Sequence, residues 1–201
     1  MIPLPGSQGS RTRRQERRPT LYARGVSLGD WLEERLFARR IVLVTGRLDD
    51  GAAAKAAAAL LALDAVNRPI DLHLDSPDGS LEAAFALIDT ADALRSTLHV
   101  RCRGLVGGPV IAVVAAADHR AAAPHARFHL SQPTARFVGS PQEIAAQSRR
   151  QQDLLWKLYG RLARRTGRAA EEIAEDMRRR RFLDAREALA YGLIDEIAAA
   201  K

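Results

Sequence analysis

The 201-residue chain has a single cysteine, only 5% aromatic residues and three lysines among its 31 basic residues. One cysteine cannot form a disulfide within the chain, which excludes a disulfide-stabilised framework and indicates a reducing compartment. Cys102 lies in an apolar segment that we predict to be a strand, where a cysteine usually packs as a small hydrophobic residue. We therefore expect no reactive thiol.

The chain also lacks a long hydrophobic run. Its longest nearly uninterrupted apolar stretch, residues 105–117, is too short to span a bilayer and is broken by Gly107, Gly108 and Pro109. The basic start of the chain is not followed by the apolar segment of a signal peptide. The sequence therefore predicts a cytoplasmic protein without a membrane partner.

The formal net charge of +7 raises the question of nucleic-acid binding. Residues 1–20 carry five arginines and one glutamate, a charge of +4, and residues 178–181 form a second arginine cluster. The bias towards arginine and alanine is typical of a GC-rich coding sequence, and no nucleic-acid motif or aromatic stacking platform accompanies it. We do not expect nucleic acid as a partner, and salt-sensitive binding to bulk DNA would contradict this.

Two regions follow from the composition. Residues 1–26, rich in proline, glycine, serine and arginine, predict a flexible basic arm, and residues 27–201 predict a single α/β domain. The expected strands are 41–45, 70–75, 98–103 and 127–131, and the expected helices in the first two thirds are 27–36, 51–66, 81–94 and 110–117. Such alternation predicts mainly parallel strand pairing.

The clearest helix signal lies further along the chain. Ser140 and Glu143 form a capping box, with Pro141 at the first helical position, and the predicted helix runs to about Thr166 before Gly167. A helix of some 26 residues exceeds the usual globular length. We expect part of it to pack outside its own subunit.

Residues 102–110 combine the end of a strand, a glycine-rich turn and the start of an apolar segment. This layout presents the nucleophilic serine of many hydrolases between a strand and a helix. Here the tip of the turn is Gly108, which has no side chain, and the next residue is Pro109, which has no N–H for an oxyanion. Taken alone, the segment is also typical of a packing turn.

Seven short strings between residues 30 and 197 resemble, in the same order, the proteolytic subunit of the Clp protease. They are residues 40–46, 75–80, 88–90, 102–104, 132–133, 181–183, and 187–188 together with 191–195. The resemblance implies the spiral of ββα units shared with crotonases, and a protruding handle helix, here residues 140–166. It also implies assembly into stacked seven-membered rings, by self-association and with active Clp proteolytic paralogues as further partners.

The resemblance implies a Ser-His-Asp triad, which the sequence can be checked against. Counting from the neighbouring strings, the serine position is Gly108, the histidine position Ser131 and the aspartate position Arg180. The oxyanion-hole positions are Gly79, which can donate, and Pro109, which cannot. None of the three triad residues is intact, so we expect a catalytically inactive ring subunit, a pseudo-peptidase with a structural or regulatory role and no cofactor or metal.

Two enzymatic alternatives stay open. One is an active ATP-dependent Clp-type serine peptidase with a displaced site. Its candidate nucleophiles are Ser76, Ser80, Thr134 and Cys102, and its candidate bases are His73, His119, His125 and His129. The other is a crotonase-like acyl-CoA enzyme, against which stand the short chain, Pro109 and the lack of a carboxylate pair near the turn.

The resemblance also bears on an ATPase unfoldase as partner. Aromatic residues of the family help to form pockets that accept an unfoldase loop. At the corresponding strand, residues 70–74, this chain has Asp71 and His73 where tyrosines are common. The sequence therefore does not favour unfoldase docking through this subunit.

Overall fold

Strands and helices alternate from residue 28 to residue 102, as the apolar segments predicted. The computed structural model describes residues 28–199, so the predicted arm of residues 1–26 lies outside the described residues. The elements are, in order, α1 (Leu28–Ala38), β1 (Ile41–Thr45), α2 (Asp50–Asp64), β2 (Ile70–Asp75), α3 (Leu81–Ala93), β3 (Leu98–Cys102), β4 (Leu105–Gly107), α4 (Val110–Val114), β5 (His119–Ala122), β6 (Arg127–His129), α5 (Pro141–Thr166), α6 (Ala170–Arg178), β7 (Phe182–Asp184), α7 (Ala185–Tyr191) and β8 (Glu196–Ile197). The predicted α/β spiral with a handle helix is confirmed.

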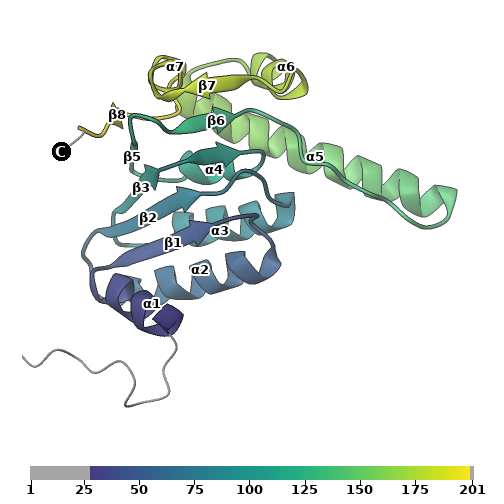
Figure 1. Ribbon diagram of the computed structural model, residues 1–201. Coiled ribbons are helices and arrows are strands. Elements are labelled where there is room, and N and C mark those ends of the chain that lie inside the picture. Colours follow the sequence, from purple (N-terminus) through teal and green to yellow (C-terminus); the bar gives the residue numbers. More distant parts are fainter. Residues whose placement is uncertain (1–27, 200–201) are drawn as a thin grey trace, which may run out of the picture.

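The larger sheet contains five parallel strands in the order β1-β2-β3-β5-β8. Val42, Leu72 and Val100 occupy neighbouring register positions on β1, β2 and β3 and are buried on one face of the sheet. Helices α2 and α3 lie side by side and cover this face (Figure 1). Parallel neighbours need crossover connections, and the helices supply them.

A smaller sheet contains β4, β6 and β7, in which β4 is parallel and β7 antiparallel to β6. Helix α4 follows β4 directly, and all five of its residues are buried. This short sheet and its flanking turns hold the positions that the sequence analysis singled out.

Helix α5 has the predicted ends. The side chain of Ser140 accepts from the Glu143 amide at 3.4 Å, Glu143 accepts from the Ser140 amide at 2.7 Å, and Gly167 closes the helix with a left-handed φ of 74°. Of its 26 residues only Leu158, Tyr159 and Leu162 are buried. The first half extends away from the body of the protein (Figure 1). Between residues 28 and 199 no helix has the combination of length and apolar character needed to cross a membrane.

Candidate functional site

The small sheet brings the three predicted triad positions to one edge. Gly108 directly follows β4, Ser131 lies two residues after β6, and Arg180 lies two residues before β7. Because β4 and β6 are parallel and β7 is antiparallel, the ends of the first two and the start of the third meet at the same edge. The Gly108 amide donates to the His129 carbonyl at 3.1 Å, which joins two of these segments directly.

In this conformation a side chain on residue 108 would collide with the side chain of Asp78. The φ of Gly108 is +56°, and a Cβ atom built on it would lie 2.6 Å from Oδ1 of Asp78. The other oxygen of Asp78 accepts from Arg47 at 2.6 Å, in an ion pair whose side chains are 38% and 57% exposed, respectively. Asp78 is a site residue that the sequence analysis missed. The available signal was its place beside Gly79, in the turn already considered for the oxyanion hole.

The backbone amides of the glycine turn take part in the fold. The Gly107 amide donates to the Ser76 carbonyl at 2.9 Å, and the Gly108 amide donates to His129 as described. Pro109, the N-cap of α4, has no N–H. The structure thus gives each amide of residues 107 and 108 a partner inside the chain.

Gly79, the other predicted oxyanion-hole position, is buried against Leu48. A Cβ atom at Gly79 would lie 2.9 Å from the Leu48 Cβ and carbonyl oxygen. The residues on either side of Gly79 form hydrogen bonds with Leu48. The Leu48 amide donates to the Asp78 carbonyl at 2.9 Å, and the Leu48 carbonyl accepts from the Ser80 amide at 3.0 Å. This close approach of two backbones explains why position 79 is a glycine.

His129 lies at the end of β6 beside the glycine turn. Its ring stacks on Phe182, with centroids 4.1 Å apart and planes 3° apart, and its buried Nε2 has no hydrogen-bond partner among residues 28–199. Burial lowers the pKa of His129, the nearby charge of Arg180 lowers it further, and Asp78 partly opposes this. The imidazole is therefore mainly neutral at pH 7. The contact with Phe182 was not foreseen from the sequence.

Three of the four displaced nucleophiles proposed from the sequence have structural roles, whereas Thr134 is exposed. Ser76 is fully buried and donates to the Asp78 carbonyl at 3.2 Å, and Ser80 caps α3 by accepting from the Ala83 amide at 3.0 Å. Cys102 is buried, and burial raises the pKa of its thiol to about 12. Within residues 28–199 no serine or threonine hydroxyl is hydrogen-bonded to a histidine nitrogen.

Ser131 and Arg180 differ in their exposure. Ser131 is buried at 5% exposure, whereas Arg180 is exposed and has a left-handed backbone with φ 55°. Over the described residues, no group of three or more histidine, cysteine, aspartate or glutamate side chains is placed to hold a metal ion. What the site presents chemically is a neutral imidazole, a carboxylate paired with Arg47, and the guanidinium of Arg180.

Comparisons with known proteins identify the family. A sequence model of the Clp protease family matches residues 28–201. The chain is 33% identical over 177 residues to the ATP-dependent Clp protease proteolytic subunit 2 of Nocardia farcinica (strain IFM 10152), covering 86% of this chain and 87% of the relative. It is 32% identical over 177 residues to the protein of the same name from Rhodococcus jostii (strain RHA1), covering 86% of this chain and 91% of the relative.

These findings correct one prediction. The residues at positions 108, 131 and 180 led us to predict that the chain is not an enzyme. The relatives are named proteolytic subunits, a class of peptidases, and this contradicts the prediction. Substitutions at three positions do not show that a protein of this kind lacks activity. The family match and the two relatives together show that the chain belongs to the Clp protease family.

Proposed function

We propose that the chain is a ring-forming subunit of a Clp-type peptidase assembly, in which it has a structural or regulatory role. The observation that carries this proposal is helix α5. Its first half has no buried residue and carries Ile144, which is 38% exposed, and further along the helix Trp156 is 51% exposed. Apolar side chains on an extended helix lower their free energy by packing on another surface. Contacts with further subunits, either copies of this chain or active paralogues, supply that surface.

The test is the mass of the native assembly. We expect light scattering to give a multimer for the chain, alone or mixed with an active Clp proteolytic paralogue. Ile144→Asp places a charge in the contact and should reduce the mass while circular dichroism stays unchanged. Leu189→Asp is the matched control, because Leu189 has a similar exposed fraction, 42%, but lies on α7. A monomer in both preparations would refute the proposal.

A second candidate function is peptide hydrolysis by residues of this chain itself, and the names of the relatives favour it. Peptidase assays and labelling with a fluorophosphonate distinguish the two. Turnover and stoichiometric labelling of a serine in the pure chain would assign hydrolysis to its own residues. Turnover that needs the paralogue, with the label on the paralogue only, would leave this chain the structural or regulatory role.

The proposal does not include docking of an ATPase unfoldase through this chain. Asp71 on β2 accepts from Arg101 at 2.9 Å and lies 3.9 Å from Nδ1 of His99, and His73, opposite Arg101 in the strand register, is 7% exposed. Charged and imidazole groups at this face are a poor match for an apolar loop. An unfoldase that binds rings of this chain alone would contradict this part.

A further inference from the structure

We infer that Arg180 makes the candidate site a binding site for a carboxylate group of a peptide. The carboxylate is that of an aspartate or glutamate side chain or of the peptide's C-terminus. The inference rests on the proposed function only in taking the ligand to be a peptide.

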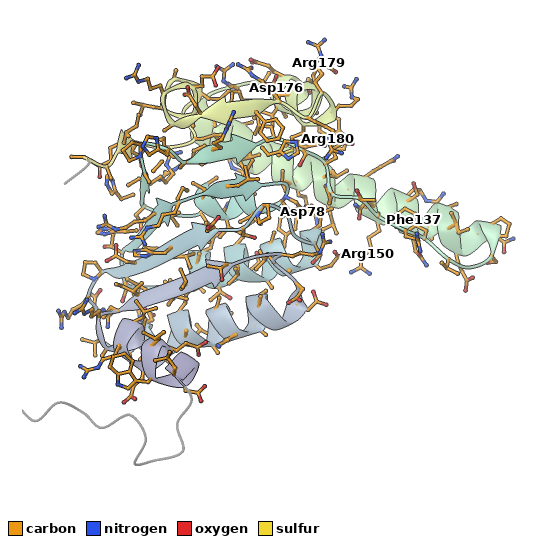
Figure 2. All side chains as sticks on the ribbon, in the orientation of Figure 1. Asp78, Phe137, Arg150, Asp176, Arg179 and Arg180 are labelled. Atoms are coloured by element: carbon orange, nitrogen blue, oxygen red, sulfur yellow. The ribbon has the colours of Figure 1, made fainter. Side chains whose placement is uncertain are left out.

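The chain reverses direction at Arg180. Helix α6 ends at Arg178, and the left-handed backbone of Arg180 is held by a bond from its amide to the Met177 carbonyl at 3.3 Å. Adjacent side chains therefore diverge: Arg179 points away from the body of the protein, whereas Arg180 lies below α6 on the side facing Asp78 (Figure 2). A non-glycine residue in this conformation is uncommon, and such strain is often found at functional sites.

Arg180 is the unneutralised member of its cluster. The other three are in ion pairs: Arg178 and Arg179 with Glu175, at 2.5 and 2.6 Å, and Arg181 with Asp176, at 3.3 Å. In the described part of the chain Arg180 has no ion pair. The carboxylates of Glu175 and Asp176 are thus paired with the arginines next to Arg180.

Among the described residues of the candidate site, none forms an ion pair with Arg180 either. Asp78 is paired with Arg47 at 2.6 Å. The positive charge of Arg180 helps to lower the pKa of His129. The neutral imidazole contributes no negative charge. The site therefore has an uncompensated positive charge beside the glycine turn.

A guanidinium favours one class of ligand. Its planar fork of N–H donors matches a carboxylate in a bidentate pair, which is stronger and more specific than a neutral hydrogen bond. A peptide that carries a carboxylate at the site would gain this pair. A peptide with a lysine there would meet repulsion instead.

Isothermal titration of the full chain with acetylated alanine–glutamine hexapeptides tests the inference. Four probes are used: two glutamates with an amidated C-terminus, no glutamate with a free C-terminus, no glutamate with an amidated C-terminus, and two lysines with an amidated C-terminus. At least one carboxylate probe should bind about tenfold or more tighter than the uncharged probe. Which of the first two binds identifies the source of the carboxylate. Equal binding of all four would overturn the inference.

Variants locate the effect. Arg180→Gln should remove the preference for the carboxylate probe, and Arg180→Glu should reverse it towards the lysine probe. Arg179→Gln is the matched control: it removes the same charge from the adjacent residue, whose side chain is paired with Glu175, and should leave affinities within about twofold. Equal losses for Arg179→Gln and Arg180→Gln would overturn the inference. Light scattering on the same samples separates this result from the assembly proposal, since a monomer that binds the probe refutes only the assembly.

Discussion

Asp78 and Gly108 share one space: the carboxylate oxygen of Asp78 lies 2.6 Å from the position of a Cβ atom on residue 108. The two residues come from different turns, one after β2 and one after β4. A side chain on residue 108 therefore requires the Asp78 carboxylate, which pairs with Arg47, to shift. This relationship leads to the first prediction.

Gly108→Ala should lower the free energy of unfolding by about 1–2 kcal/mol from its left-handed backbone, plus up to about 1 kcal/mol from the displaced Asp78–Arg47 pair. Gly167→Ala is a matched control, because Gly167 has a φ of 74° but nothing within 4 Å of its Cβ position. Denaturant unfolding should show the larger loss for Gly108→Ala. When both glycine substitutions are made in an Asp78→Ala background, they should lower the free energy of unfolding equally. Equal losses for Gly108→Ala and Gly167→Ala in the parent protein would refute the prediction.

The buried guanidinium of Arg120 connects the C-terminal segment to the large sheet. It donates to the carbonyls of Gly192 and Leu193 at 2.7 and 3.1 Å and pairs with Asp195, whose side chain is 34% exposed. Removal of one partner from a buried ion pair lowers the free energy of unfolding by about 3–5 kcal/mol. Because Asp195 is partly exposed, we expect Arg120→Leu to lie at the lower end of this range, about 3 kcal/mol.

Arg101→Leu is the control for that variant. Arg101 also pairs with an aspartate, Asp71, at 2.9 Å, but its side chain is 46% exposed. Exposed pairs contribute about 0–1 kcal/mol. Thermal unfolding should therefore separate the two variants clearly. Similar losses for both would show that Arg120 does not hold the C-terminal segment.

Asp195 predicts a loss of stability in acid. Burial acts to raise the pKa of this carboxyl, but the hydrogen bonds from Arg120 outweigh it and hold the pKa below the usual value of 3.8. A carboxyl with a lowered pKa in the folded state adds stability above its unfolded pKa, and this stability is lost as the pH falls through the folded value. The difference in Tm between the parent protein and Asp195→Asn should be constant from pH 7 to 5. It should then shrink below about pH 4. A constant difference down to pH 2 would contradict this.

Cys102 should be unreactive in the folded protein. Its thiol is buried, and burial raises the pKa to about 12, so the thiolate that reacts with alkylating agents is scarce at pH 8. Iodoacetamide should label the protein in guanidinium chloride but not in native buffer, as mass spectrometry can measure. Stoichiometric labelling of the native protein would show that β3 opens readily.

The sequence by itself determined the features that depend on local pattern. The capping box at Ser140 and the glycine at position 167 define both ends of α5, and the alternation of apolar segments predicted the parallel sheet. The strings that resemble the Clp protease identified the family. Strands β4, β5, β7 and β8 were not foreseen, because segments of two to four residues form strands only when a neighbour offers its hydrogen bonds.

Only the tertiary structure decided how the site is arranged. Counting along the chain named Gly108, Ser131 and Arg180, but it could not show that Asp78 occupies the space at Gly108 or that Phe182 stacks on His129. Nor could three substituted positions establish whether the protein is an enzyme. Contacts of this kind depend on strand register and on backbone angles at turns, which join residues far apart in the sequence. The left-handed backbone of Arg180, which sets its side chain apart from that of Arg179, comes from such a turn.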